Sequence, residues 1–363
     1  MNPLKQLPKH GQSVYMDEIR RKWLEDGTLA KLIEDDGIHG VTSNPAIFEK
    51  AIAQTSDYDE AIDKANERGD SVDKIYEDIV IEDIQDAADA FRDQYEASDG
   101  KFGYISLEVS PKLANNTQGT VEEARKLWQR LDRPNVFIKV PATKEGLSAI
   151  ETLISEGISV NVTLIFGLER YRKVAEAYIA GLEKRHEAGK PINRVYSVAS
   201  FFLSRIDVMV DEMLADKGNT ELQGKVAVAN AKVAYQIYKE VFSGERWNKL
   251  VSEGAMPQPL LWASTGTKNP DYPDTMYVEP LIGENTINTM PPKTMDAYRD
   301  HGEPAKRIEE GADEAQATLD KVAELGIDMD EVTQKLEDEG VDKFIKPFES
   351  LMNTLRDAAK QAA

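Results

Sequence analysis

Short runs of β-forming residues alternate along this chain with longer segments of helical periodicity, and this alternation restricts the possible folds more than any other feature. We predict eight strands, at residues 13–17, 38–44, 104–109, 136–140, 159–166, 194–202, 260–265 and 276–282. Between them, amphipathic segments such as residues 71–95, 120–131 and 168–186 repeat apolar side chains about every 3.6 residues. Repeated strand–helix units of this kind are typical of an α/β protein with a parallel sheet.

The number of these units favours a closed (β/α)8 TIM barrel over an open doubly wound sheet, and the dinucleotide fingerprint GxGxxG is absent. We interpret residues 1–363 as one barrel domain, with residues 304–363 as a helical C-terminal extension packed on the barrel. The last helix has an apolar stripe, made of Phe344, Phe348, Leu351, Met352 and Leu355. The simpler interpretation places this helix on the outer wall, and the alternative is a lid over the active-site face.

Charge and composition exclude several classes of function. The chain has 44 Lys and Arg against 65 Asp and Glu, a net charge of −21, which would repel nucleic acids and anionic membranes. It has no cysteine, which removes disulfides and thiolate chemistry and fits a reducing compartment. No apolar run is long enough for a signal peptide or a membrane span, so we expect a cytoplasmic protein. The four histidines lack metal-site spacing, and we expect neither a metal nor a cofactor.

Polar residues recur within or at the ends of the predicted strands, where the carboxyl ends of barrel strands form an active site. They are Asp17, Asn44, Glu108, Lys139, Asn161, Thr163, Ser200, Arg205, Ser264, Thr265 and Thr267. Each alone is a weak signal, because an Asp or Asn at a strand end is commonly a turn former or a helix N-cap. Their recurrence in successive strands indicates one shared site.

Lys139 is the least ordinary of these residues, because Phe137, Ile138 and Val140 surround it. Strand periodicity places it on the same face as Phe137 and opposite Ile138 and Val140. An edge-strand or snorkelling lysine would explain the pattern without any function. Alternatively, burial disfavours an ammonium group and favours a free amine, which can attack a carbonyl carbon to form a Schiff base.

Several of these segments, in this order, resemble the transaldolases of the pentose phosphate pathway. They are GVTSNPAIF, FIKVPAT, SVNVTLIF and SFFLSR. Three more segments resemble the longer bacterial type of the family, namely LWASTGTKNPDY, INTMP and ELGIDMDEVTQKLEDEGVDKF. The similarity extends from about Val14 to Leu355 and implies a Schiff-base enzyme on a (β/α)8 barrel. The implied reaction transfers a dihydroxyacetone unit from sedoheptulose 7-phosphate to glyceraldehyde 3-phosphate, giving erythrose 4-phosphate and fructose 6-phosphate.

The resemblance also implies roles for the catalytic residues. Lys139 would form the Schiff base, and Asp17 would exchange the proton of the C4 hydroxyl. Glu108 would hold the water of carbinolamine dehydration, with Thr163 as a second partner for that water. The protonated imine would act as an electron sink during cleavage of the C3–C4 bond.

The substrate-binding residues follow from the same resemblance. Asn44, Asn161 and Ser200 would bind hydroxyls of the three-carbon unit, while Arg205 would bind the phosphate. Shorter transaldolases add a Ser and an Arg after the seventh strand. Ser264 matches that Ser by position, but the Arg has no clear counterpart, and Lys268 is either its substitute or a solvated loop lysine.

Two other functions stay open from the sequence. One is a Schiff-base aldolase that releases free dihydroxyacetone, like fructose-6-phosphate aldolase, and the other is a non-catalytic barrel that binds sugar phosphates. The greater length of the chain, with Glu108 and Asp17, favours the transferase over the aldolase, because the resemblance implies a different acid/base group in the short aldolases. The presence of Asp17, Glu108 and Lys139 speaks against the binding protein, which does not need an imine-forming amine. The sequence leaves open whether the protein is a monomer or a homodimer.

Overall fold

Eight parallel strands close into a barrel in the computed structural model, which describes residues 2–362. The strands are β1 (Gln12–Met16), β2 (Gly40–Val41), β3 (Tyr104–Glu108), β4 (Val136–Pro141), β5 (Val160–Ile165), β6 (Ser197–Phe202), β7 (Leu260–Ala263) and β8 (Thr286–Met290). Each strand pairs with the next one along the chain, and β8 pairs with β1. The predicted (β/α)8 fold is confirmed.

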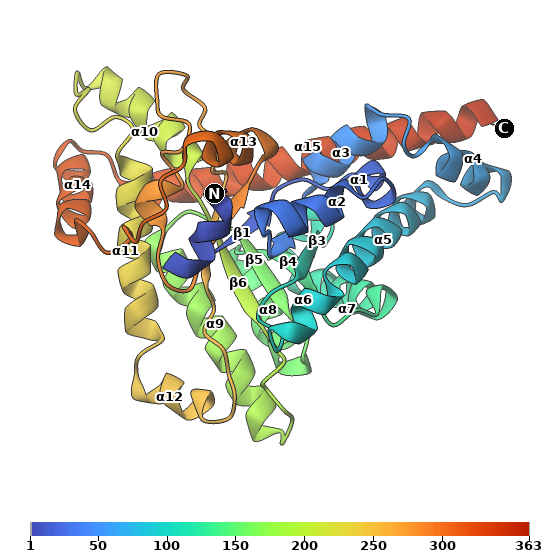
Figure 1. Cartoon of the computed structure of the whole chain (residues 1–363), viewed down its shortest axis with the longest axis horizontal. Coiled ribbons are helices and arrows are strands. Elements are labelled where there is room, and N and C mark those ends of the chain that lie inside the picture. Colours follow the sequence, from blue (N-terminus) through green and yellow to red (C-terminus); the bar gives the residue numbers. More distant parts are fainter. Residues whose placement is uncertain (1, 363) are drawn as a thin grey trace.

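Helices follow the strands and surround the barrel (Figure 1). The α-helices are α1 (Arg21–Glu25), α2 (Thr28–Lys31), α3 (Pro45–Ala53), α4 (Asp59–Glu67), α5 (Val72–Ala90), α6 (Arg92–Ala97), α7 (Thr117–Leu131), α8 (Lys144–Glu156), α9 (Leu168–Glu187), α10 (Ser204–Asp216), α11 (Val226–Val241), α12 (Glu245–Val251), α13 (Pro292–His301), α14 (Ala312–Glu324) and α15 (Met329–Ala362). Shorter turns of helix are η1 (Leu4–His10), η2 (Leu32–Asp36), η3 (Pro111–Leu113) and η4 (Glu279–Leu281). No helix among residues 2–362 is long and apolar enough to cross a membrane.

The predicted eighth strand is wrong. Residues 276–282 form turns and the short helix η4, and the strand is β8, which begins at Thr286. Pro280 lies inside the expected run and has no N–H for a ladder hydrogen bond. The polar composition of β8 hides it in the sequence, yet its side chains are buried and bonded: Asn288 donates to the carbonyl of Tyr277 at 3.0 Å.

The second strand is shorter than predicted, because only Gly40 and Val41 have ladder partners in β1 and β3. The chain then turns into α3. Asn44 is the N-cap of this helix, since its side-chain oxygen accepts from the backbone N–H groups of Ala46 and Ile47, and Pro45 starts the first turn.

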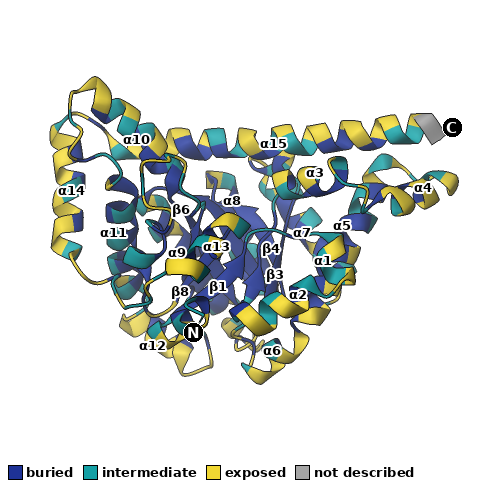
Figure 2. Ribbon diagram, turned by 45° about the horizontal axis from the view of Figure 1, so that its top comes forward, coloured by how far each residue is buried: buried dark blue, intermediate teal, exposed yellow. Residues whose placement is uncertain are grey.

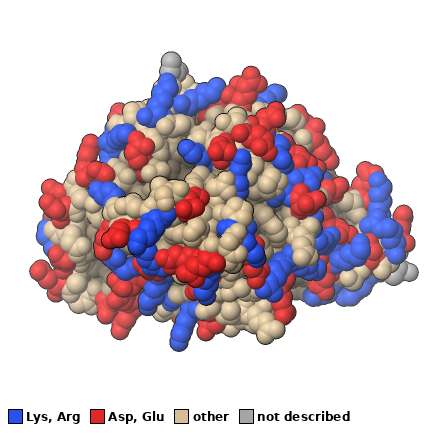
Figure 3. Space-filling model, turned by 90° about the horizontal axis from the view of Figure 1, so that it is seen from below, with Lys and Arg blue, Asp and Glu red and all other residues tan. Residues whose placement is uncertain are grey.

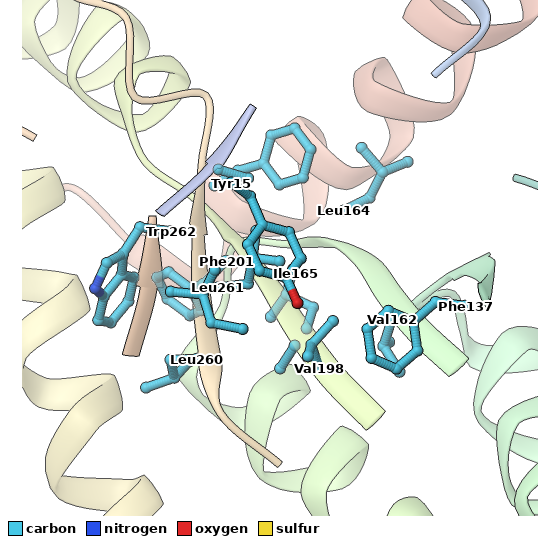
Figure 4. Packing of buried hydrophobic residues seen from close by; sticks show 14 of the residues in the cluster. Tyr15, Phe137, Val162, Leu164, Ile165, Val198, Phe201, Leu260, Leu261 and Trp262 are labelled. Carbon is cyan, nitrogen blue, oxygen red and sulfur yellow. The ribbon is translucent and has the colours of Figure 1, made fainter. Parts of the chain in front are cut away.

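The core joins the barrel to its helices in one cluster of buried apolar side chains. Tyr15, Phe137 and Leu261 belong to this cluster, and Figure 4 shows part of their packing. The dark interior strands in Figure 2 are surrounded by helices whose outer faces are exposed. On the face that Figure 3 shows, acidic and basic side chains are intermixed, and no broad basic patch gathers there.

The long C-terminal helix α15 runs across one end of the barrel instead of lying only on its outer wall (Figure 2). It contacts α3, α5 and β5. A Cβ atom added at Gly340 would lie 3.0 Å from Cδ2 of Leu164, so a glycine here lets the helix approach β5 closely. The simpler sequence interpretation, a helix confined to the outer wall, is therefore wrong.

Candidate functional site

A polar pocket of about 140 Å³ lies at the carboxyl ends of the strands, under α15. Its wall includes eight of the ten predicted site residues, namely Asp17, Asn44, Lys139, Thr163, Ser200, Arg205, Ser264 and Lys268. The other two, Glu108 and Asn161, lie beside it and are bonded to residues of the wall. The fold thus brings the whole predicted set into one site, which we call the sugar pocket.

Lys139 lies on β4 and is only 4% exposed, so the edge-strand interpretation is wrong. Its Nζ donates to the carbonyl oxygen of Ser43 at 3.0 Å. The same atom lies 5.5 Å from the ring centroid of Phe344 on α15. The amine is held by one carbonyl and covered by one aromatic ring at the edge of the pocket.

Glu108 pairs with Lys139 because β3 and β4 align these two residues in register. Oε2 of Glu108 lies 3.4 Å from Nζ of Lys139, and both side chains are buried. Burial raises the pKa of Glu108 to about 7, although the charge of Lys139 opposes this shift. A carboxyl with this pKa can both accept and donate a proton near neutral pH.

Asp17 follows β1 and faces the same pocket. Its Oδ1 accepts a hydrogen bond from the hydroxyl of Thr42 at 2.7 Å. Burial raises the pKa of Asp17 above its ordinary value, while Lys139 and the Thr42 hydrogen bond act in the opposite direction. A raised pKa makes this carboxylate a stronger base than an exposed aspartate.

Thr163 lies on β5 with its hydroxyl buried, and that Oγ1 has no hydrogen-bond partner among the described residues. The strand is irregular directly after it. The register of β5 against β6 shifts between Val162 and Ile165, and Leu164 has a φ of 59°. An unpartnered buried hydroxyl in a polar pocket is a position where a substrate group or a water molecule can bind.

Asn161 and Ser200 form a short hydrogen-bonded chain on β5 and β6. The Ser200 hydroxyl donates to Oδ1 of Asn161 at 2.7 Å, and Nδ2 of Asn161 donates to the hydroxyl of Ser106 at 3.0 Å. Asn161 is fully buried and is in register with Lys139. Ser200 thus connects the pocket wall to the buried Asn161 amide.

Three further predicted residues lie on the side of β6 and β7. Nη1 of Arg205 is buried without a partner within the described chain, and its guanidinium lies 5.4 Å from the ring centroid of Phe202. Ser264 has a φ of 56°, and its hydroxyl bonds that of Ser204 at 2.8 Å. Burial and the nearby charge of Arg205 lower the pKa of Lys268. Lys268 is an exposed loop residue that also lines the pocket, so both interpretations of it stay open.

Thr42, Thr289 and Phe344 line the pocket but were not predicted as site residues. The Thr42 hydroxyl uses its single hydrogen to donate to Asp17. In the 2.6 Å hydrogen bond between the hydroxyls of Thr42 and Thr289, the donor is therefore Thr289. Thr42 lies in the same GVTSN segment as Asn44, and its polar side chain was the available signal. Phe344 appeared only as part of an apolar stripe, since nothing local distinguishes an active-site cover from core packing.

A buried lysine that is paired with one carboxylate and shares its pocket with a second, at the carboxyl ends of parallel barrel strands, places the chain in the class of (β/α)8-barrel enzymes. The family model described as Transaldolase/Fructose-6-phosphate aldolase matches residues 14–355. The chain belongs to this family.

Curated relatives match over almost their whole length. A transaldolase of Thiobacillus denitrificans is 49% identical over 97% of this chain and 99% of its own. A transaldolase of Thermobifida fusca is 50% identical over 97% of each chain. A protein of Nostoc punctiforme named transaldolase 2 is 46% identical over 99% of this chain and 98% of its own.

Proposed function

We propose that this protein is a transaldolase that acts through an imine on Lys139. It transfers a dihydroxyacetone unit from sedoheptulose 7-phosphate to glyceraldehyde 3-phosphate and needs no cofactor. The observation that supports this most directly is the buried pair of Lys139 and Glu108, 3.4 Å apart, in the same pocket as Asp17. Membership of the family and the names of its relatives agree with this assignment.

Imine formation uses the proton that the Lys139–Glu108 pair shares. The ammonium transfers a proton to the Glu108 carboxylate, and the free amine attacks C2 of the ketose to form a carbinolamine. Glu108 then protonates the leaving hydroxyl, the C2–O bond breaks, and water departs. These steps need no proton from outside the site. They end with an iminium cation beside an ionised Glu108. Thr163 is the second partner of this water, and its unpartnered Oγ1 in the same pocket supports that role.

Cleavage of the C3–C4 bond requires a base for the C4 hydroxyl. Asp17 takes that proton, C4 becomes an aldehyde carbon, and the electron pair of the broken bond moves to the imine nitrogen as an enamine. In the second half-reaction the enamine carbon attacks the aldehyde carbon of the acceptor, and Asp17 returns its proton to the new hydroxyl. Water then hydrolyses the imine.

Binding is divided between the two ends of the pocket. Asn44, Asn161 and Ser200 bind hydroxyls of the three-carbon unit near Lys139. Arg205, Ser264 and Lys268 bind the phosphate, and the two cations compensate locally for the net charge of −21 that otherwise opposes anionic substrates. The protein works in the cytoplasm on small sugar phosphates.

Borohydride reduction in the presence of fructose 6-phosphate tests this function. A secondary amine adduct is expected on the peptide that contains Lys139 and is expected to be absent from the K139M variant. An adduct on any other peptide, or no adduct at all, would show that the proposed mechanism is wrong. The K268M variant is the matched control, because it removes a lysine of the same pocket that has no covalent role.

The description of the family also covers fructose-6-phosphate aldolase, so that activity is the second candidate. The two reactions differ in the fate of the enamine, which the aldolase protonates and releases as free dihydroxyacetone. Fructose 6-phosphate without an acceptor separates them: a transferase releases little dihydroxyacetone, and an aldolase releases it steadily. A barrel that only binds sugar phosphates would give neither product nor adduct.

A further inference from the structure

A second cavity, of about 280 Å³, reaches Glu108 from the side of α5, α7 and α15. Two of the residues that line it, Asp73 and Arg356, are charged and exposed and form its rim. Three others, Val80, Leu107 and Glu108, are buried and form its inner wall. The cavity therefore leads from solvent to the carboxyl group that is paired with Lys139. We call it the rear cavity.

Glu108 and Lys139 separate the rear cavity from the sugar pocket. Lys139 lines the sugar pocket and Glu108 lines the rear cavity. Their ion pair, with Nζ and Oε2 3.4 Å apart, forms the boundary between the two spaces. Helix α15 covers both spaces with aromatic rings one turn apart. Phe344 lies over Lys139 in the sugar pocket, and Phe348 lines the rear cavity, where its ring meets that of Tyr76 edge-on at 5.4 Å.

The rear cavity has polar groups that can bond water along its length. Oε2 of Glu108 is buried, and apart from the ion pair with Nζ of Lys139 at 3.4 Å it has no hydrogen-bond partner among the described side chains. Glu123 lines the same cavity and accepts a hydrogen bond from the backbone N–H of Ser110 at 3.0 Å. Tyr76 lines the same cavity, and burial raises the pKa of its hydroxyl, to which the Glu123 and Glu108 carboxylates add.

The chemistry at Lys139 creates a need for such a route. Each imine that forms releases one water molecule, and each imine that is hydrolysed consumes one. During both steps the sugar fills the pocket of about 140 Å³ and Phe344 covers the amine. Water that leaves through the mouth would have to pass the bound sugar phosphate.

We propose that the rear cavity is the path by which water reaches and leaves the imine, with Glu108 as the group that passes it between cavity and pocket. This inference rests on the proposed Schiff-base function. The ligand of the cavity is water, and the sugar never enters it.

Oxygen exchange tests the path. Fructose 6-phosphate labelled with ¹⁸O at C2 loses its label when the released water escapes before the imine is hydrolysed, and keeps it when the same water returns. The V80W variant places a large ring in the rear cavity. The matched control is I79W, on the same helix, because Ile79 is also buried but lines a different groove of about 380 Å³ between α4 and α5. Imine formation is measured in parallel by rapid borohydride trapping, and background exchange is measured without enzyme.

V80W is expected to lower the loss of ¹⁸O per imine formed at least threefold, and I79W is expected to leave it unchanged. A second variant, L127W, fills the cavity from α7 and repeats the test if V80W does not fold. Unchanged exchange in the cavity variants, with imine formation intact, would overturn the path and show that water leaves through the mouth. The path would also be overturned if I79W lowered the loss of ¹⁸O per imine as much as V80W does. If the wild-type enzyme forms no imine, the proposed function itself fails, and the path fails with it.

Discussion

The amine of Lys139 lies 3.4 Å from a carboxylate oxygen of Glu108, on neighbouring strands that hold the two residues in register. Because both side chains are buried, proton transfer within this pair replaces the ion pair by two neutral groups and leaves the net charge of the site unchanged. The pair can therefore supply both the nucleophile and the acid for imine formation.

Glu108 should give the reaction its pH dependence near neutrality. Its pKa is raised to about 7, so the ionised carboxylate that takes the proton of the Lys139 ammonium is lost as the pH falls below that value, and imine formation should slow there. E108Q should slow imine formation about 100-fold or more and remove this acid limb. Stopped-flow trapping of the imine from pH 5 to 9 measures both effects. An acid limb that persists in E108Q would assign it to another group.

The same carboxyl should affect stability in a defined direction. A carboxyl whose pKa rises from 4.5 in the unfolded chain to about 7 in the folded one binds more protons when folded between these values. The free energy of unfolding should therefore contain a contribution that falls as the pH rises from about 4.5 to 7. Urea titrations of the wild type and of E108Q at pH 5 and 7 measure it as the difference between the two proteins, and a difference of opposite sign would contradict the burial of this carboxyl as its cause.

D17N should separate imine formation from bond cleavage. The amide cannot take the C4 proton, so the C3–C4 bond should break about 100- to 10,000-fold more slowly. The imine on Lys139 should still form, and borohydride should trap it at a high level with fructose 6-phosphate. Mass spectrometry of the adduct distinguishes an intact six-carbon sugar from the three-carbon unit. A three-carbon adduct at the wild-type rate would exclude Asp17 as the base.

T163V should weaken the binding of the water at the imine, because it replaces the unpartnered hydroxyl by a methyl group of similar size. One hydrogen bond has a net value of about 0.5–1.5 kcal/mol, so dehydration and hydrolysis should slow about threefold to tenfold. T163S keeps the hydroxyl and should restore most of the rate. If T163S is as slow as T163V, loss of the hydroxyl does not explain the slower reaction of T163V.

R205A should raise KM for phosphorylated substrates about 10- to 100-fold, since a hydrogen bond to a charged group contributes about 1.5–3 kcal/mol. Unphosphorylated fructose should be affected much less. K268A should shift the same ratio by a smaller factor, because Lys268 lies at the exposed edge of the pocket. Steady-state kinetics with both substrates measure the ratio, and equal effects on both would remove the phosphate site from this side.

F344A should admit water to the enamine, since this ring lies over Lys139. Release of free dihydroxyacetone from fructose 6-phosphate without an acceptor should increase relative to transfer. F344L keeps an apolar cover and should behave more like the wild type. Deletion of the chain beyond about Asp342 should have the larger effect of the same sign. If F344A and the deletion both left transfer unchanged and released no extra dihydroxyacetone, α15 would not protect the enamine.

The sequence determined the alternation of strands and helices, because the positions of apolar side chains dictate which local structure can bury them. It also singled out Lys139, since a charged residue within a run of buried apolar positions needs a reason to be there. It failed at β8, where the buried side chains of Thr286 and Asn288 donate to the backbone carbonyls of Gly283 and Tyr277, and where the polar composition resembles a loop in the sequence.

Only the tertiary structure decided which of these residues meet. The register of β3 on β4 sets Glu108 against Lys139, and the return of α15 over the barrel mouth brings Phe344 onto the same amine. The meeting of Lys268 and Arg205 in one pocket and the cavity behind Glu108 likewise come from segments far apart in the chain. The local sequence pattern indicates which side chains are buried. The distances between side chains on different strands and helices are set only when the barrel closes.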